Sequence, residues 1–378
     1  MSWITGVGWT PFGKHPQKNT LDLMSEASES ALADAQLERR DIDGLLCGYS
    51  TTLPHLMLST VFAEHFGLQP RYAHSILVGG ATGFAMAMAA HHLVESRQAD
   101  NILVVAGENR LTGQGRDAAI QTLAQVGHPE YEVPLGAIIP AYYGLVASRY
   151  MHEFGNTEQD FAELAVLMRR HAMIHPGAQF REPVTVDTVM ASKPVASPLK
   201  LLDCCPVSDG GAAFVVSRTR LNSFPVRICG TGQAHTHQHV SAGESLTHFG
   251  AAESVARALD AASIRLSNVN YAAIYDSFTI TLALLLEEIG FAPRGGAGRL
   301  ARDGHFDRDG KMPLNTHGGL LSYGHCGVGG AMAHLVETHL QLSGRAQDRQ
   351  VKIPRYALLH GDGGVLSSHV SLVLENVE

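Results

Sequence analysis

One pattern of elements occurs twice along this chain of 378 residues, and it limits the folds that the chain can adopt. In each copy a helical segment leads through a short polar turn into an apolar strand: residues 35–43 precede the strand 44–49, and residues 262–270 precede the strand 271–276. Later in each copy, a helix that begins in a Gly-rich turn is followed by a strand that ends at glycine, at 102–107 and again at 357–361. Continuous apolar strands are covered on both faces by helices. The repeat therefore predicts an α/β protein with two similar halves.

The two halves are unequal in length. We assign residues 1–225 to the first half and 226–378 to the second, with Pro225 as the boundary. Residues 112 to about 200 form an insertion in the first half, which contains several prolines and a predicted helix from 158 to about 171. A long insertion at the end of a strand commonly forms a lid or a substrate-binding lobe.

Composition excludes several classes of function. The net charge of −8 gives no reason to expect nucleic acid or an anionic membrane as a partner. No apolar run reaches the roughly 18 residues that span a bilayer, and residues 3–8 read as a first strand, not as a secretion signal. The five cysteines are odd in number and lack CxxC spacing, which fits a reducing cytoplasm and predicts neither disulfides nor a zinc site.

A Gly-rich turn at residues 79–83 joins a strand to a helix of small residues. This layout can hold a nucleophile at a helix N-terminus, where aligned N–H groups stabilise a thiolate or an oxyanion. Gly80 occupies the place where that nucleophile would stand. The turn also resembles a dinucleotide-binding loop, with Glu108 as the ribose ligand, but Met86 replaces the third glycine. Glycines that let a helix pack closely on a strand would explain the turn equally well.

Two further segments carry candidate catalytic groups. Tyr275 and Asp276 follow a buried strand, where active sites of α/β proteins collect, and they could serve as acid and base. Asp276 could instead cap the helix that follows. Residues 315–330 hold six glycines within 318–330 together with Tyr323, His325 and Cys326. Such glycine density permits close backbone approach to an anion or a thioester oxygen.

Histidines at alternate positions, His235, His237 and His239, could share one face of a strand. They lack an evident fourth ligand, so we expect a loop there and no metal site. The neighbouring thiols Cys204 and Cys205 are interpreted as a buried turn of small residues.

Together these motifs, in this order, resemble the thiolase superfamily over nearly the whole chain. The resemblance rests on residues 80–83, 208–213, 275–278, 322–325 and 360–364, and it is strongest to sterol-carrier-protein-type thiolases and thiolase-like lipid-transfer proteins. It implies two duplicated βαβ halves in a five-layer αβαβα arrangement, a homodimer, and action on acyl-CoA thioesters. Coenzyme A would then be part of the substrate, with no further cofactor. The same motifs imply a set of substrate-binding residues: Gly80, Thr82, Gly83, Gly318, Gly319, His360 and Gly361.

The sequence departs from the thiolase pattern at two places. Gly80 stands where thiolases carry the acyl-accepting cysteine, and His360-Gly361 stands where they carry a second, acid/base cysteine. Without the first thiol no acyl-enzyme can form at that position. His325 is retained, and in thiolases this histidine helps to polarise the thioester oxygen, which needs no cysteine.

One branch of the superfamily is similar in lacking the nucleophile: aldolases of steroid side-chain breakdown, which cleave a β-hydroxyacyl-CoA by retro-aldol chemistry. Tyr275 and Tyr323 match by motif the tyrosines that act there as acid and base, so one of them is expected to be the base and the other to protonate the enolate carbon. Assistance to the base is expected from His325 or Asp276. The resemblance also implies a small OB-fold, zinc-ribbon partner protein.

Two alternatives remain open at this level. The chain could be an acyltransferase that recruits another group, such as Cys326, as its thiol. It could also be a catalytically inert subunit that binds acyl-CoA.

Overall fold

The computed structural model describes residues 1–136, 138–221, 224 and 226–377. The described strands form a nine-stranded mixed sheet in the order β3-β2-β4-β7-β1-β8-β11-β10-β9, and a small two-stranded sheet. Strands of the first half are β1 (Ser2–Trp9), β2 (Gly44–Gly48), β3 (Tyr72–Ile76), β4 (Asn101–Asn109) and β7 (Asp209–Ser217). Strands of the second half are β8 (Val226–His235), β9 (Tyr271–Ile274), β10 (Tyr356–Gly363) and β11 (Ser368–Asn376). The small sheet consists of β5 (Pro194–Ala196) and β6 (Leu199–Lys200).

The two halves of the large sheet mirror each other about the contact between β1 and β8. On one side of this contact the order is β1-β7-β4-β2, and on the other it is β8-β11-β10-β9. In both sets the second strand is antiparallel to its neighbours and the outer two strands are parallel. The predicted duplication is therefore present, with β3 as an additional edge strand in the first half.

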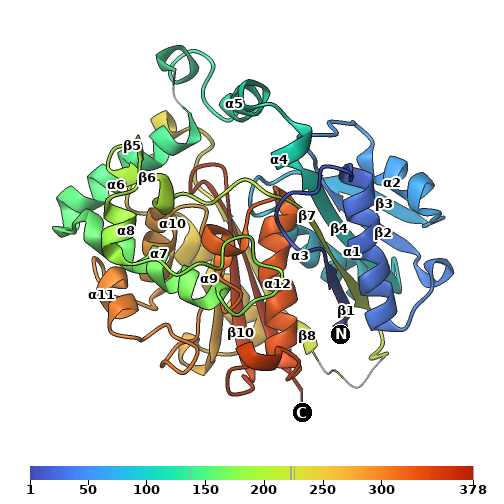
Figure 1. Ribbon diagram of the computed structural model, residues 1–378. Helices are drawn as coiled ribbons and strands as arrows, with labels where there is room; N and C mark the ends of the chain where they lie inside the picture. The colour runs from blue at the N-terminus through green and yellow to red at the C-terminus, as the bar shows by residue number, and fades with distance from the viewer. Residues whose placement is uncertain (137, 222–223, 225, 378) are drawn as a thin grey trace.

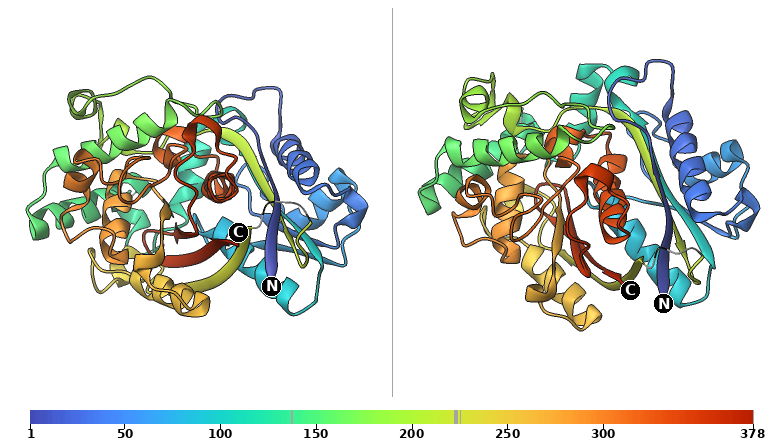
Figure 2. Two further views of the ribbon diagram at one scale, coloured as in Figure 1. Left: turned by 90° about the horizontal axis from the view of Figure 1, so that it is seen from below. Right: turned by 60° about the horizontal axis from the view of Figure 1, so that its bottom comes forward.

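Twelve α-helices of the described residues surround the sheet. They are α1 (Thr20–Ala35), α2 (Leu58–Phe66), α3 (Thr82–Glu95), α4 (Arg110–Gly113), α5 (Arg116–Ala124), α6 (Ile139–Phe154), α7 (Glu158–Ala172), α8 (Val186–Met190), α9 (Ala251–Ala262), α10 (Thr279–Ile289), α11 (Ala297–Arg302) and α12 (Val328–Leu342). Helices α3 and α12 contact each other and strands of both halves of the sheet, whereas α1 and α9 contact one half each. Figures 1 and 2 show α3 and α12 between the halves and the other helices outside them. This is the five-layer thiolase arrangement.

Paired glycines explain how each outer helix lies so close to its sheet. Gly6 and Gly8 of β1 face α1, where an added Cβ would come within 2.3 and 2.2 Å of helix carbonyl oxygens. Gly230 and Gly232 of β8 face α9, and a Cβ at either position would come within 2.1 Å of a helix carbonyl oxygen. Only glycine permits this approach. The sequence repeat thus extends to a Gly-x-Gly pair in the first strand of each half, which our sequence analysis did not use.

The insertion folds onto the second half of the molecule. Helix α7, predicted from 158 to about 171, begins with a capping box in which Thr157 and Asp160 satisfy each other's backbone N–H groups. It packs against α10 and α11, and α6 packs against α10 (Figure 1). The insertion therefore reaches across the boundary between the halves. The proposed boundary residue, Pro225, lies outside the described residues, so the division at 225/226 stays a prediction. Within the described residues, no helix is long and apolar enough to cross a membrane.

Candidate active site

A cavity of about 260 Å³ lies where the parallel strands of both halves end. Tyr49 follows β2, Glu108 lies at the end of β4, Tyr275 follows β9, and Gly364 follows β10. Ligands of α/β proteins bind beyond the carboxyl ends of parallel strands. The lining is completed by the segments after β2, β4 and β9, the turn before α3, the insertion, the segment before β7 and the segment that leads into α12, with these residues: Thr51, Gly79, Gly80, Arg110, Leu123, Val126, Ile139, Pro140, Tyr143, Cys204, Cys205, Pro206, Val207, Ser277, Phe278, His325, Gly327 and Val328.

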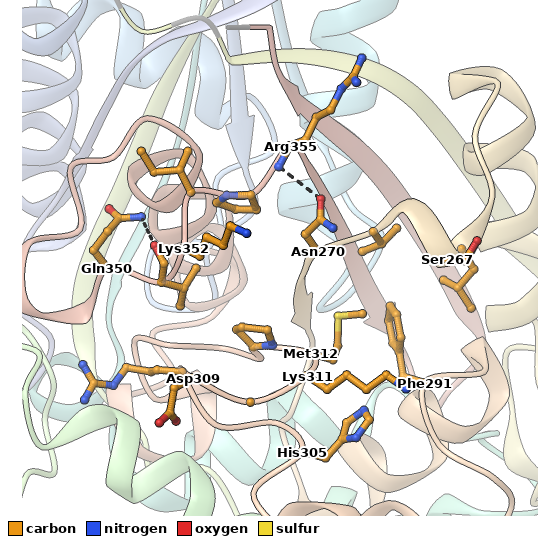
Figure 3. Close-up of a pocket in the computed structure, with 18 of the residues that line it drawn as sticks. Ser267, Asn270, Phe291, His305, Asp309, Lys311, Met312, Gln350, Lys352 and Arg355 are labelled. Carbon is orange, nitrogen blue, oxygen red and sulfur yellow. Dashed lines mark hydrogen bonds between the residues drawn. The ribbon is translucent and has the colours of Figure 1, made fainter.

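A larger concavity of the described residues, about 1340 Å³, lies at the other end of β9 and β10. Figure 3 shows Asn270, which precedes β9, and Arg355, which precedes β10, among the residues that line it, together with Lys311 and Lys352. None of the candidate catalytic residues lines this groove, and it is separated from the cavity by the length of the strands. We therefore identify the smaller cavity as the candidate active site.

Gly80 lines the cavity, and a side chain at this position has no room. A Cβ on Gly80 would lie 2.3 Å from Oη of Tyr275 and 2.4 Å from the backbone oxygen of Asp362. Normal contact between such atoms requires about 3.5 Å. The gap expected from the sequence is therefore closed: the phenol of Tyr275 occupies the space beside Gly80 in which a thiol would stand.

The hydroxyl of Tyr275 is oriented by His325. Oη of Tyr275 lies 3.1 Å from Nε2 of His325. On the other side of the imidazole ring, Nδ1 faces the backbone N–H of Gly327 at 3.2 Å and Nη1 of Arg110 at 3.4 Å. Both of these groups can only donate, so we assign Nδ1 as the acceptor and place the imidazole proton on Nε2. His325 then donates to Tyr275, and the hydroxyl proton of Tyr275 is free to point into the cavity.

Burial fixes the protonation states of this pair. Burial, together with the positive charge of Arg110, lowers the pKa of His325 to about 3. Burial also raises the pKa of Tyr275 well above its usual value, and the neighbouring Cys205 and Asp362 act in the same direction. At neutral pH the imidazole is uncharged and the phenol holds its proton. Tyr275 is consequently suited to donate a proton and poorly suited to accept one.

Glu108 and Tyr49 are two cavity residues that our sequence reasoning did not assign to this site. Oε2 of Glu108 accepts hydrogen bonds from the backbone N–H and the hydroxyl of Thr51, at 2.8 and 2.6 Å. Its other oxygen, Oε1, is buried and has no hydrogen-bond partner among the described residues. Burial raises the pKa of the Tyr49 phenol most, and the nearby carboxylate of Glu108 raises it further. The one feature of the sequence that could have assigned both residues to the site was their position at the end of a predicted strand.

Arg110 supplies a positive charge to the same cavity, and its Nε is buried without a partner among the described residues. Elsewhere in the lining, Tyr143 stacks on Phe278 with ring centroids 4.3 Å apart and donates to Oδ2 of Asp362 at 3.1 Å. Burial raises the pKa of Asp362, and the bond from Tyr143 opposes this in part. The cavity thus combines one fixed cation with buried groups that are neutral or easily neutralised.

Tyr323 lies away from the cavity, which differs from the expectation that it works as a partner of Tyr275. It belongs to a π-helical turn, η6 (Gly319–Tyr323), and its buried ring packs against Phe12, His175 and His317. Its ring therefore belongs to a buried aromatic cluster, and Tyr323 is not among the described residues that line the cavity.

Asp276 is also buried behind the cavity and does not line it. Its Oδ1 accepts the backbone N–H of Leu320 at 2.7 Å and lies 3.3 Å from Nε2 of His334. The alternative expectation is that Asp276 caps the helix that begins after residue 278. Its carboxylate instead holds the η6 turn. Its role is to position the segment that carries His325.

Cys326 is fully buried in the cluster around Tyr323, outside the cavity lining. Burial raises the pKa of its thiol well above the usual value, and Glu108 adds to this. The thiols that do line the cavity are Cys204 and Cys205, and burial raises the pKa of Cys205 to about 12. The structure therefore brings no thiol that is ionised at neutral pH to the described part of the site.

The remaining predicted substrate-binding residues have structural roles next to the site. Thr82 bridges the backbone of the turn at 78–79, and His360 contacts Ser371 and His369 on the face of β10 away from the cavity. The glycines allow close packing against Met332, Ala172, Asp276 and Phe84, and they are, in that order, Gly83, Gly318, Gly319 and Gly361. None of these six residues lines the cavity. Among the described residues no three His, Cys, Asp or Glu side chains are placed to hold a metal ion.

Comparison with known families places the chain in a class. Residues 2–220 match the family described as thiolase, N-terminal domain, and residues 232–376 match thiolase C-terminal domain-like. The chain belongs to the thiolase superfamily, and it is an acyl-CoA enzyme of the acyltransferase or lyase type.

Individual relatives include both types. An acetyl-CoA acetyltransferase of Methanothermobacter thermautotrophicus is 30% identical over 97% of this chain and 98% of its own length. A steroid side-chain-cleaving aldolase of Thermomonospora curvata is 32% identical over 84% of this chain and 85% of its own. Among solved structures, an Ltp2-ChsH2(DUF35) aldolase superposes with a TM-score of 0.86 at 30% identity, covering 99% of this chain and 97% of that one.

Proposed function

We propose that this protein is a carbon–carbon lyase that cleaves a bulky β-hydroxyacyl-CoA by retro-aldol chemistry. The observation that carries the proposal is that the phenol of Tyr275 takes the place of a nucleophilic side chain at residue 80. The position has no side chain, and the hydroxyl of Tyr275 fills the adjoining space 2.3 Å from where a Cβ would lie. The cavity therefore offers a proton donor where a covalent mechanism requires a nucleophile. Similarity to an aldolase that cleaves steroid side chains supports the same reaction type.

The reaction needs two things that the cavity residues can supply. Breaking the bond between Cα and Cβ leaves an enolate on the thioester, and its negative charge must be stabilised. Arg110 carries a positive charge in the cavity, and its guanidinium lies 3.4 Å from His325. The enolate carbon must then be protonated, and Tyr275 holds its proton toward the cavity for this step. Neither step uses a covalent intermediate.

The walls of the cavity favour an apolar acyl group. Leu123, Val126, Ile139 and Pro140 come from the insertion, and Phe278 adds an aromatic ring to the lining. A volume of 260 Å³ is at the lower end of the range of about 300–1,000 Å³ for ligand pockets. We infer that the cavity holds the thioester and the reacting carbons, and that a bulky acyl group extends along the insertion. Coenzyme A would be part of the substrate, and the reaction requires no further cofactor.

An acyltransferase reaction through Cys326 has weaker support, because that thiol is buried outside the cavity lining and keeps its proton. A catalytically inert subunit would not need the ordered contact from Arg110 through His325 to Tyr275. Both alternatives are separated from the lyase by one experiment.

The purified protein is incubated with the CoA thioester of (1-hydroxycyclohexyl)acetic acid, without free CoA, and the products are measured by mass spectrometry. Retro-aldol cleavage gives cyclohexanone and acetyl-CoA. We expect Tyr275→Phe to reduce the rate by about 10²–10⁴-fold, the contribution typical of acid–base catalysis. Tyr323→Phe is the matched control, because Tyr323 is buried outside the cavity, and it should keep the activity. A requirement for free CoA, or an acylated protein during turnover, would show the acyltransferase instead.

Partner proteins belong to the same proposal. Strand β3 is an edge of the large sheet, and the apolar residues Leu56, Met57 and Leu77 next to it are 99%, 60% and 69% exposed. Open edge strands are templates for pairing with a second chain. We infer that two copies associate across this edge, and that a small OB-fold, zinc-ribbon protein binds elsewhere, as the two-component name of the similar aldolase structure suggests. Light scattering of wild type and Leu77→Asp tests the dimer: unchanged mass in the variant would refute it.

A further inference from the structure

Retro-aldol cleavage requires a base for the β-hydroxyl proton, and Tyr275 cannot be that base when it holds its own proton. Among the described side chains that line the cavity, the groups able to accept a proton are tyrosines, thiols, His325 and Glu108. Both ring nitrogens of His325 are engaged, with Nδ1 accepting from Gly327 and Arg110 and Nε2 donating to Tyr275. The phenols and thiols are neutral at neutral pH. The carboxyl group of Glu108 is the remaining candidate.

We propose that Glu108 is the catalytic base that takes the proton from the β-hydroxyl group of the substrate, an inference that rests on the proposed lyase function. One oxygen of Glu108 is held and the other is available. Thr51 fixes Oε2 through two hydrogen bonds, and Oε1 is buried without a partner among the described residues. A buried carboxylate oxygen without a hydrogen bond costs free energy, which a substrate hydroxyl would recover.

Gly327 leaves the space in which this oxygen lies. A Cβ at residue 327 would come within 2.1 Å of Oε1 of Glu108, and the backbone of Gly327 has φ +68°, a conformation that favours glycine. Gly327 also lines the cavity and donates its N–H to His325. The base and the histidine that orients the acid are therefore held on two sides of one residue, at the same wall of the cavity.

The proposed step balances without another reactant. Glu108 takes the proton of the β-hydroxyl as the bond between Cα and Cβ breaks, so that the hydroxyl carbon becomes a ketone. The electron pair of the broken bond passes into the thioester as an enolate beside Arg110. Tyr275 then gives its proton to Cα, and Glu108 returns the first proton to Tyr275 through solvent. The products are a ketone and a shortened acyl-CoA.

The electrostatics of the wall agree with a base that works near neutral pH. Burial raises the pKa of Glu108 above its usual range, while the charge of Arg110 and the hydrogen bonds from Thr51 oppose this in part. The other titratable groups that face Glu108 are Tyr49 and Cys326, both neutral at neutral pH. A raised pKa makes a carboxylate a stronger base while it stays ionised at the working pH. Cleavage should therefore rise with pH through the pKa of Glu108.

The test compares Glu108→Gln with wild type on the cyclohexyl probe described above, with kcat, KM and the pH profile as readouts. We expect kcat to fall by about 10²–10⁴-fold, KM to change little, and the acidic limb of the profile to disappear. Glu288→Gln is the matched control, because Glu288 also has one oxygen bonded to a backbone N–H and one buried oxygen without a partner, but lies outside the cavity lining. Thermal unfolding of both variants checks that they fold.

A second variant separates a base from a merely structural carboxylate. In Glu108→Ala, added formate should restore part of the lost cleavage, because a small carboxylate can enter the space of the missing side chain. Cleavage by Glu108→Gln within threefold of wild type, or a folded Glu108→Ala that formate does not rescue, would overturn the assignment while leaving the lyase function in place. If wild type releases no ketone, the proposed function itself fails.

Discussion

Gly80→Ala tests the central geometric claim, that no side chain fits at this position. The new Cβ would lie 2.3 Å from Oη and 2.5 Å from Cζ of Tyr275, and 2.4 Å from the carbonyl oxygen of Asp362. Each contact is about 1.1 Å shorter than van der Waals contact. The tyrosine is buried and the carbonyl belongs to β10, so neither can move freely. Overpacking of this kind costs about 1–3 kcal/mol.

The assay is urea unfolding followed by circular dichroism, with the free energy of unfolding compared at unchanged m-value. Gly83→Ala is the control within the same segment. Its Cβ would meet Cγ of Met332 at 2.6 Å, which is part of a flexible side chain, and alanine favours the helix by up to about 1 kcal/mol. We expect Gly80→Ala to be destabilised by clearly more than Gly83→Ala. Equal stability of Gly80→Ala and wild type within about 0.5 kcal/mol would refute the reasoning.

A double-mutant cycle shows how much of the cost comes from the tyrosine. In a Tyr275→Ala background, Gly80→Ala should cost less by about 0.5–2 kcal/mol, since residues in contact couple by such amounts. Part of the destabilisation by Gly80→Ala should remain in this background, because the carbonyl oxygen of Asp362 is still 2.4 Å from the added Cβ. Additive effects of the two substitutions would mean that Tyr275 does not fill the space beside Gly80.

Three further predictions concern the surroundings of the site. Asp276→Asn should lower kcat, measured by turnover, and should lower the free energy of unfolding by about 1–3 kcal/mol, because the carboxylate holds the turn at 319–323. Arg349→Ala should cost about 3–5 kcal/mol in urea unfolding, because it leaves the buried carboxylate of Glu337 without its cationic partner. Burial raises the pKa of Glu337, but the charges of Arg349 and His175 and the hydrogen bonds from Arg349 and Gln341 together lower it below its usual value. The pair therefore stabilises wild type above about pH 4.3, and its contribution is lost as pH falls further; a variant with the same acid dependence as wild type would contradict this. Iodoacetamide at neutral pH should leave Cys205 unmodified in the native protein and alkylate it after unfolding, as read by mass spectrometry.

The duplicated fold could be predicted from the sequence because its signals are local. Helix, polar turn and apolar strand repeat in the order that the structure shows, and the motifs at 80–83 and 275–278 lie at strand ends, where α/β sites form. Tyr275 reaches the cavity for this reason. Its contact with His325, 50 residues further along the chain, depends also on the segment between η6 and α12 that carries the histidine.

The direction in which a side chain points could not be predicted from the sequence. This explains why some candidate residues do not lie in the cavity where the sequence analysis expected them. Tyr323 is two residues from His325, but the π-helical turn points its ring into the buried aromatic cluster instead of the cavity. No spacing in the sequence announces such a turn. Glu108 was visible only as an acidic residue at a strand end. Its meaning depends on Thr51, which anchors one oxygen, and on Gly327, which makes room for the other.

The exchange of a thiol for a phenol at this site is not reversed by one substitution. A cysteine at position 80 would have to displace Tyr275, and removing that phenol would leave the carbonyl oxygen of Asp362 still 2.4 Å from the new Cβ. The end of β10 would therefore also have to shift, together with Asp362, whose side chain Tyr143 holds at 3.1 Å. The glycine, the tyrosine and the end of this strand are thus fitted to one another. For this reason we expect Gly80→Cys/Tyr275→Ala to fold less stably than wild type and to form no acyl-enzyme, and an intact-mass increase with an acyl-CoA at residue 80 would show that the backbone is freer than these contacts indicate.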